Sequence, residues 1–208
     1  MSMRIGCGWD SHAFQPGVPL IIGGIAIDHP EGLAGHSDGD VLLHAITDAL
    51  LGALAVGDIG SFFPPGDPRW KNADSAIFLN LALEEVRTAG YRIVNVDTTL
   101  VLAAPKIGPI SGDMRQRVAE LLEIQPNAVG IKAKTPEGLN LDHVAQAQAV
   151  VLLESSDDKL GLGLLEAEVD DPAKVDEVLT HIGVSEGLGS SKSRRMVPLP
   201  AFDTEDIT

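Results

Sequence analysis

The chain is poor in cysteine, long apolar runs, positive charge and aromatic residues, and these shortages limit the classes of protein to which it can belong. It contains a single cysteine, Cys7, in 208 residues, so it can form no internal disulfide framework and fits a reducing compartment. No apolar run reaches the ~18–20 residues needed to span a bilayer. Residues 1–4 lead straight into a strand-like segment with no signal peptide. We therefore expect a cytoplasmic protein with no membrane partner.

Positive charge is also scarce, with 15 Lys and Arg residues against 30 Asp and Glu residues and a net charge of −15. A phosphate backbone would be repelled, so we expect no nucleic-acid partner. A small phosphorylated ligand is still compatible with this charge, because a few local donors and a metal can override the global field. Aromatic residues make up only 4% of the chain and hydrophobic residues 44%, which predicts a sizeable core of Leu, Val, Ile and Ala.

Hydrophobic periodicity predicts an α+β fold, with a mixed β-sheet and helices packed on one face. Residues 20–27 form an apolar run broken by Gly23-Gly24, which indicates a bent strand or a hairpin. Asp38 is expected to cap the first helix. We expect strands at 3–9, 91–103 and 127–133, helices at about 38–55, 74–89, 109–123 and 142–154, and loops at 28–37 and 56–71.

The composition changes after residue 154, so we divide the chain into a main domain, 1–154, and a C-terminal extension, 155–208. Asp171-Pro172 is expected to open a short amphipathic helix over about 172–182, because Pro is favoured at the first helical position. Its apolar stripe would consist of Val175, Val178, Leu179 and Ile182. The remainder is rich in Gly and Ser and predicts a mobile tail.

Three potential metal ligands lie in two Gly-rich stretches. Asp10 and His12 are two residues apart on an extended segment, so their side chains point to one face. His44, on the first predicted helix, would complete a three-ligand site with an open fourth position, as in catalytic zinc sites. For an isolated Asp-x-His pair the commoner interpretation is a strand end with no metal, so the surrounding sequence decides.

That surrounding sequence reads RIGCGWDSH over residues 4–12 and GHSDGDVLLHAITDALLGA over residues 35–53. It continues through GDIG at 57–60, ADS at 73–75, NVD at 95–97, PK at 105–106 and KAKTPE at 132–137. Over about residues 3–154 the chain resembles the 2-C-methyl-D-erythritol 2,4-cyclodiphosphate synthase family.

The resemblance implies a phosphorus–oxygen lyase of non-mevalonate isoprenoid biosynthesis. Its reaction is the cyclisation of 4-diphosphocytidyl-2-C-methyl-D-erythritol 2-phosphate to 2-C-methyl-D-erythritol 2,4-cyclodiphosphate with release of CMP. The resemblance also implies a homotrimer assembled around the sheets, with active sites at the subunit interfaces.

The resemblance implies roles for individual residues. Asp10, His12 and His44 would hold one tightly bound Zn²⁺ per chain, and Glu137 would hold Mg²⁺ or Mn²⁺ bridging the diphosphate. His36 and Thr135 would be catalytic and stabilise the transition state. The substrate-binding positions would be Asp10, His12, Ser37, Asp58, Gly60, Phe63, Asp67, Leu102, Ala103, Pro105, Lys106, Ile107, Lys134 and Glu137, with Asp58 and Gly60 on the erythritol and 102–107 forming the cytidine pocket.

Several of these residues have a plainer alternative. His36 could cap the helix that follows it, Asp58 could be a turn residue, and Lys106 could be an ordinary exposed lysine. His29, His143 and His181 match no role in the family, and we interpret them as surface or loop histidines.

The chain departs from the family's pattern near its end. The family has a Thr-rich run before its glutamate and a Gly-Arg-Gly-Glu-Gly stretch after it, whereas here Lys134 and Pro136 flank Thr135 and residues 140–147 read NLDHVAQA. Ala103 stands where a glutamine is common. The missing arginine removes a bidentate phosphate or interface contact, which Lys134 could partly replace. Two alternatives therefore stay open: a same-fold enzyme for a different phosphorylated substrate, and a non-catalytic trimeric paralogue that binds a metal or nucleotide.

Overall fold

The computed structural model describes residues 2–156. The predicted extension, with its 172–182 helix and mobile tail, lies outside the described residues. Within residues 2–156, no helix is long and apolar enough to cross a membrane. The elements are β1 (Met3–Pro16), β2 (Leu20–Ile22), β3 (Ile25–Ile27), β4 (Glu31–Leu33), α1 (Val41–Leu54), α2 (Ile59–Phe62), α3 (Ser75–Thr88), β5 (Tyr91–Val101), α4 (Ser111–Leu122), β6 (Val129–Lys134) and β7 (Val144–Ser155), with three short 3-10 helices at Pro68–Trp70, Gly108–Ile110 and Pro126–Ala128.

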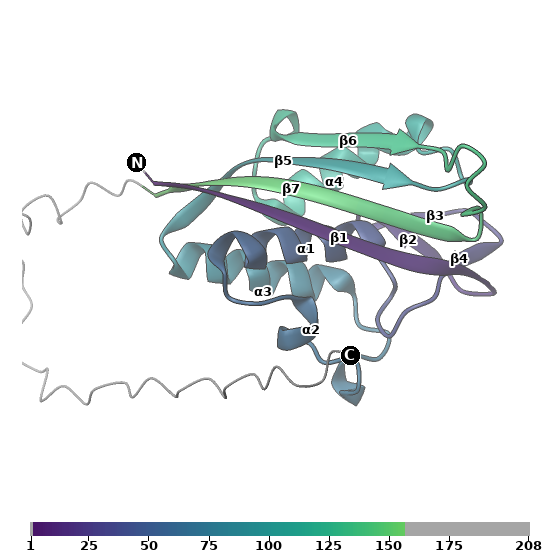
Figure 1. Cartoon of the computed structure of the whole chain (residues 1–208), viewed down its shortest axis with the longest axis horizontal. Coiled ribbons are helices and arrows are strands. Elements are labelled where there is room, and N and C mark those ends of the chain that lie inside the picture. Colours follow the sequence, from purple (N-terminus) through teal and green to yellow (C-terminus); the bar gives the residue numbers. More distant parts are fainter. Residues whose placement is uncertain (1, 157–208) are drawn as a thin grey trace, which may run out of the picture. The chain divides into compact units, whose positions relative to one another are not determined.

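The main sheet has five strands in the order β4-β1-β7-β5-β6. The β5–β6 pair is parallel and the other pairs are antiparallel, so the sheet is mixed. The strands β2 and β3 form a separate antiparallel hairpin. Figure 1 shows the helices on one side of the sheet, with α1 nearest to β1 and β7. The predicted mixed sheet with helices on one face is thus confirmed.

One predicted element is wrong. Residues 142–154, expected to be a helix, form β7, which pairs with β1 on one side and β5 on the other. Along this strand every second side chain is buried against the helices: Ala145, Ala147, Ala149, Val151 and Leu153. Ala and Gln favour helices, but the period of two and the central place in the sheet decide the structure.

The boundaries of other elements also differ from the prediction. The first strand continues to Pro16, well beyond residue 9. The predicted loop at 56–71 contains α2 and a 3-10 helix. Helix α1 begins at Val41, and its N-cap is Asp40, not Asp38.

Asp40 ties the β2–β3 hairpin to the start of α1. Its carboxylate is fully buried and accepts hydrogen bonds from the backbone N–H groups of Leu42 and Leu43 at 3.1 and 3.0 Å. It also accepts from Gly23 and Gly24 in the hairpin turn, at 2.9 and 2.6 Å. Both glycines have positive φ angles, 65° and 71°, which glycine adopts at little cost. One side chain therefore fixes both segments.

Helix α1 lies unusually close to β1, because neither element has a large side chain at the contact. A Cβ atom built on Gly6 would lie 1.8 Å from the Ala49 carbonyl oxygen, and one on Gly8 would lie 2.0 Å from the Ala45 carbonyl oxygen. Gly6 and Gly8 share the helix-facing side of β1 with Asp10 and His12. The close approach therefore brings His44, which precedes Ala45, to the two ligands on the strand.

The close approach can be tested with Gly8→Ala. We expect the added methyl group to push α1 away from β1 and to lower the free energy of unfolding by about 1–3 kcal/mol, the range for overpacking, as measured by urea denaturation. Gly52→Ala is the matched control on α1, because its Cβ would meet only the Cys7 carbonyl oxygen, at 3.9 Å. Unchanged stability in Gly8→Ala would contradict the proposed constraint.

Candidate active site

The structure brings Asp10, His12 and His44 together, as predicted. Asp10 Oδ2 lies 2.9 Å from His12 Nε2 and 3.0 Å from His44 Nδ1, and the two ring nitrogens are 3.2 Å apart. Four ligands arranged tetrahedrally at zinc distances of about 2.0–2.1 Å would be about 3.3 Å from one another. The three atoms therefore already form one face of a tetrahedron of the size that zinc requires, and the donor set of two imidazoles and a carboxylate suits that ion.

The charges in this cluster favour an ionised Asp10. Burial alone would raise the pKa of Asp10, but hydrogen bonds and charge from His12 and His44 outweigh it and hold that pKa well below its usual range. Burial lowers the pKa of His12, but the Asp10 carboxylate and the Ala34 carbonyl outweigh it and raise that pKa overall. A divalent ion bound here would displace the proton that the raised pKa favours on His12, and the ion would then balance the Asp10 carboxylate.

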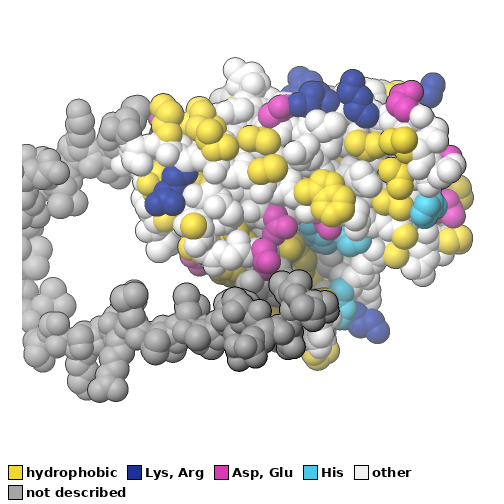
Figure 2. Space-filling view, viewed as in Figure 1, with side chains coloured by type: hydrophobic (Ala, Val, Ile, Leu, Met, Phe, Trp, Pro, Cys, Tyr) yellow, Lys and Arg dark blue, Asp and Glu magenta, His cyan; other side chains and the backbone are white. Residues whose placement is uncertain are grey.

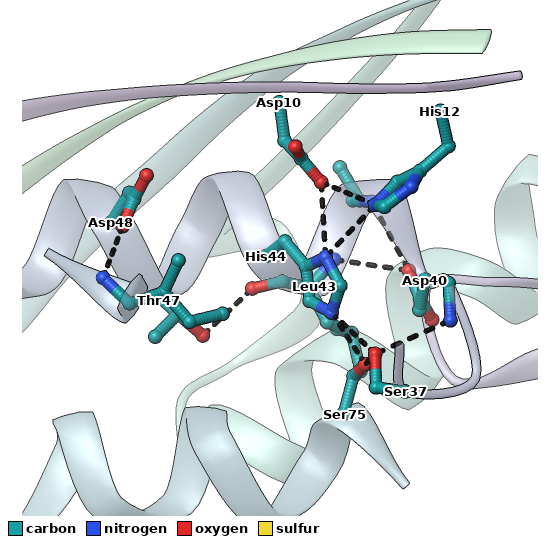
Figure 3. A network of polar contacts seen from close by, with 12 residues as sticks. Asp10, His12, Ser37, Asp40, Leu43, His44, Thr47, Asp48 and Ser75 are labelled. Atoms are coloured by element: carbon teal, nitrogen blue, oxygen red, sulfur yellow. Dashed lines mark hydrogen bonds and ion pairs between the residues drawn. The ribbon is translucent and has the colours of Figure 1, made fainter. Parts of the chain in front are cut away.

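Each histidine is also held by its second ring nitrogen. His12 Nδ1 lies 2.6 Å from the carbonyl oxygen of Ala34. His44 Nε2 lies 2.8 Å from the hydroxyl of Ser75 and 3.1 Å from that of Ser37. Figure 3 shows the His44 ring between Asp10 and His12 on one side and the two serines on the other. Such outer contacts orient metal-binding imidazoles.

A cavity of about 220 Å³ opens beside the two histidines. His36 and Ser37 belong to it, and His36 Nε2 lies 3.0 Å from the carbonyl oxygen of Asp67. His36 therefore faces the cavity and does not cap α1. Part of the wall is an aromatic cluster, in which Phe63 and Phe78 have ring centroids 4.4 Å apart. The lining residues are His12, His36, Ser37, His44, Ile59, Gly60, Phe63, Pro65, Trp70 and Phe78.

Two other predicted site residues, Asp58 and Asp67, serve as caps in this structure. Asp58 caps α2 and accepts from the N–H and hydroxyl of Ser61 at 2.7 and 2.6 Å, which lowers the pKa of this exposed carboxyl. Asp67 caps a 3-10 helix and pairs with Arg69. The plainer interpretation of Asp58 as a turn residue describes its contacts here, and neither carboxylate lines the cavity beside the histidines.

A second cavity, of about 390 Å³, contains the residues predicted for cytidine. The hydroxyl of Thr135 at its edge donates to the carboxylate of Glu137, which has a positive φ of 51°. Lys106 and Lys134 add positive charge to a mostly apolar wall. The lining residues are Leu102, Ala103, Pro105, Lys106, Ile107, Gly108, Pro109, Ser111, Ile131, Ala133, Lys134 and Thr135.

The two cavities share no lining residue. Strand β1, which carries Asp10 and His12, is separated from β6 by β7 and β5. One row of the sheet runs from Ser11 through Gln146 and Val101 to Lys134, and three steps of ~4.8 Å make it about 14 Å wide. The predicted site residues therefore form two separate groups in one chain, which we call the metal half-site (the predicted metal ligands Asp10, His12 and His44) and the nucleotide half-site (the residues predicted to bind cytidine).

Comparison with known proteins decides the family. The model of the YgbB family matches residues 3–154. The chain belongs to this family. It is 64% identical over 152 residues to a 2-C-methyl-D-erythritol 2,4-cyclodiphosphate synthase of Koribacter versatilis, covering 73% of this chain and 98% of that protein. A synthase of the same name from Moorella thermoacetica is 50% identical over 165 residues, covering 78% of this chain and 100% of that protein.

Solved structures agree with this assignment. A structure of 2C-methyl-D-erythritol-2,4-cyclodiphosphate synthase is 44% identical, with a TM-score of 0.69, and covers 73% of this chain and 100% of the solved one. A CDP-bound form of a synthase of the same name is 42% identical, with the same TM-score and coverage. The resemblance to the 2-C-methyl-D-erythritol 2,4-cyclodiphosphate synthase family that the sequence motifs indicated is confirmed.

Sequence reasoning missed Ser75, Trp70 and Phe78 as neighbours of the metal half-site. Ser75 belongs to the ADS motif at 73–75 but has no predicted role, and the two aromatic residues carry no local signal. All three lie more than 25 positions beyond His44 in the sequence. Their role depends on how α3 and the preceding loop pack against α1, and no spacing rule encodes that packing.

The metal half-site can be tested with His44→Ala. We expect the full-length protein to carry about one zinc per chain. The variant should lose most of it, because only two of the three protein ligands that such a site uses would remain. Elemental analysis after dialysis against a weak chelator gives the occupancy. His29→Ala is the control, because His29 hydrogen-bonds the nearby Glu31 backbone and packs against Phe14 but is not one of the three predicted ligands. Full zinc occupancy in His44→Ala would show that the ligand set is wrong.

Proposed function

We propose that this chain catalyses the cyclisation of 4-diphosphocytidyl-2-C-methyl-D-erythritol 2-phosphate to 2-C-methyl-D-erythritol 2,4-cyclodiphosphate, with release of CMP. The observation that carries the proposal is the triangle of Asp10, His12 and His44 ligand atoms, in a chain 64% identical to a synthase of that name. The lone cysteine, Cys7, agrees with a cytoplasmic location, which stays a prediction.

The reaction is an internal phosphoryl transfer. An oxygen of the 2-phosphate forms a bond to the β-phosphorus, and the bond from that phosphorus to the oxygen bridging it to CMP breaks, so that CMP leaves with the electron pair. No protein nucleophile is required. The chain's contribution is therefore to place the two phosphates within reach and to balance the charge on their oxygens.

The metal half-site would hold the β-phosphate. Asp10, His12 and His44 are the proposed zinc ligands. Glu137, which lies beside Thr135 at the edge of the nucleotide half-site, is the proposed ligand of a magnesium or manganese ion. When bound, these ions supply Lewis-acid polarisation of phosphate oxygens. His36, which faces the cavity beside the zinc ligands, would donate to an oxygen that gains charge in the transition state.

The nucleotide half-site would hold the cytidine. Its wall from Leu102 to Ile107 offers backbone donors and acceptors to the base, and Lys106 lies at its edge. Lys134 is exposed on the same cavity, so its ammonium group could contact the diphosphate in place of the arginine that the sequence lacks. Asp58 and Gly60 are proposed to hold the erythritol hydroxyls, Ser37 to donate to phosphate or to the diol, and Phe63 and Asp67 to contact the substrate. Binding at Asp58 would require its carboxylate to share its bonds to Ser61.

We further propose that the complete site forms between subunits of a homotrimer. His36 and Thr135 are proposed to act on one transferring phosphoryl group, yet Thr135 follows β6 at the edge of the sheet, and β7 and β5 lie between β6 and β1. A Thr135 from a neighbouring subunit removes this difficulty. The surface that would meet the neighbour is the outer face of the sheet, where Ile5 is 72% exposed and Trp9 57% exposed. Figure 2 shows hydrophobic side chains scattered over the strands of this face.

The proposed activity predicts that the full-length protein with zinc and magnesium releases one CMP per substrate cyclised. Chromatography would detect the CMP, and ³¹P NMR would detect the cyclic diphosphate. His36→Ala should lower kcat by about 10²-fold or more, the scale for losing one donor to a developing charge, whereas His29→Ala should match the wild type. Cyclisation of another phosphorylated substrate alone would favour the same-fold alternative, and zinc binding without any turnover would favour the non-catalytic one.

The assembly predicts a mass near three times 21.9 kDa in light scattering at micromolar concentration. Trp9→Glu should shift the protein to monomers, because a carboxylate would be buried in an apolar interface. Ile77→Glu is the matched control, since Ile77 is 49% exposed but lies on α3, away from the sheet face. A monomeric wild type, or a Trp9→Glu protein that stays trimeric, would contradict this arrangement.

A further inference from the structure

His44 makes contacts through both ring nitrogens, and they differ in kind. Nδ1 faces the other two ligands, Asp10 at 3.0 Å and His12 at 3.2 Å. Nε2 faces the opposite way, toward the hydroxyls of Ser75 at 2.8 Å and Ser37 at 3.1 Å. Only a ring nitrogen without a proton can bind a cation. The metal half-site therefore requires the proton of neutral His44 to sit on Nε2.

The contacts of Ser75 determine where that proton sits. Its hydroxyl donates to Oδ1 of Asp38, and its backbone N–H donates to Oδ2 of the same carboxylate at 3.1 Å. A serine hydroxyl has one proton to donate and can otherwise only accept. Because the Asp38 carboxylate takes that proton, the Ser75 oxygen can only accept from His44, which needs a proton on Nε2.

We propose that Asp38 and Ser75 are positioning residues that keep the proton of His44 on Nε2 and so present the Nδ1 lone pair to a divalent cation. This inference rests on the proposed metal half-site but goes beyond its three ligands. The order of donation runs from the His44 ring to the Ser75 hydroxyl and from that hydroxyl to the Asp38 carboxylate. Each group in this order therefore donates its proton to a group that is free to accept it.

Two serines lie near Nε2, and the structure favours Ser75 as the partner. Ser75 is fully buried and is fixed by two hydrogen bonds to Asp38, whereas Ser37 is half-buried and lines the cavity beside the zinc ligands. The Ser37 oxygen lies 3.4 Å from the Gly39 nitrogen and 3.5 Å from the Ser75 oxygen. With Nε2 protonated, the Ser37 hydroxyl keeps its own proton available for a ligand in the cavity.

The surrounding backbone holds this relay in place. Ser75 is the first residue of α3, where backbone N–H groups lack helical partners, and the Asp38 carboxylate accepts from one of them. Asp38 is fixed in turn by its own N–H, which donates to the Ala73 carbonyl at 3.0 Å, and by the Asp40 N–H, which donates to its Oδ1 at 3.2 Å. The relay therefore links the loop before α1, the start of α3 and the metal ligand on α1.

His12 is oriented in a similar way, but the roles of its two ring nitrogens are exchanged relative to those of His44. Its Nδ1 donates to the Ala34 carbonyl at 2.6 Å, which leaves Nε2 for the cation. The two imidazoles thus present different ring nitrogens to the cation. The position of the proton is fixed by a backbone carbonyl at His12 and by a serine hydroxyl at His44. The backbone carbonyl at His12 cannot be removed by mutation, but the side chains at His44 can be, so His44 is where the inference can be tested.

The experiment measures zinc affinity of the full-length protein by competition with a chromophoric chelator, and the visible absorption of the cobalt-substituted protein. Ser75→Ala should weaken zinc binding by about 10–100-fold, the usual effect of losing an outer partner of a ligand, and should change the cobalt spectrum. Ser37→Ala is the matched control at the same nitrogen. It should leave the zinc affinity within about 3-fold of the wild type and the cobalt spectrum unchanged. Ser75→Thr keeps the hydroxyl and should bind zinc like the wild type.

Urea denaturation of each variant without metal separates loss of folding from loss of the relay. If Ser75→Ala does not fold, Asp38→Asn decides, because an amide has one acceptor oxygen where the carboxylate uses two to accept from the Ser75 hydroxyl and N–H. This variant should also weaken zinc binding. Wild-type affinity and an unchanged cobalt spectrum in a folded Ser75→Ala or Asp38→Asn protein would overturn the inference. Equal losses in Ser75→Ala and Ser37→Ala would also overturn it. A wild-type protein that binds no zinc would instead refute the metal half-site itself.

Discussion

The close contact between β1 and α1 is the constraint on which the metal half-site depends. Gly6 and Gly8 have no side chain to separate the strand from the helix, and the facing positions of α1 are Ala45, Ala49 and Ala53. The separation of the two elements is therefore set by backbone against backbone. Asp10 and His12 lie on the same face of the strand as the two glycines. The His44 side chain on the closely packed helix is therefore near enough to contact both of them. The same packing buries most of α1 and supports the core.

Polar contacts then convert this proximity into a site of defined geometry. The Asp40 carboxylate fixes the start of α1 and the hairpin beside it through four backbone N–H groups. Ser75 and the Ala34 carbonyl orient the two imidazoles from behind. A preorganised set of ligands loses less freedom on binding a cation than a flexible one. This local arrangement, and not the net charge of −15, decides whether a phosphorylated ligand and its cations can bind.

The width of the sheet explains why one chain carries two half-sites. The metal half-site lies on β1 and α1, and the nucleotide half-site lies at the end of β6, with β7 and β5 between them. No local rearrangement can bring Thr135 to His36 across paired strands without breaking their hydrogen bonds. The proposed assembly of copies through the outer face of the sheet would join the halves without such a rearrangement, and it would also cover the exposed Trp9 and Ile5.

The sequence by itself determined the fold class, the family and the facing of Asp10 and His12, because alternation along a strand and a long specific motif are local properties. It also placed the residues predicted to bind cytidine in one segment, 102–107. Only the tertiary structure decided that residues 144–155 form a central strand, since Ala and Gln fit a helix equally well until neighbouring strands supply the hydrogen bonds. Likewise, Asp40 rather than Asp38 caps α1, because Asp38 is engaged by Ser75 on another helix. The orientation of His44 depends on groups far apart in the chain, so it is fixed by packing and no local pattern could predict it.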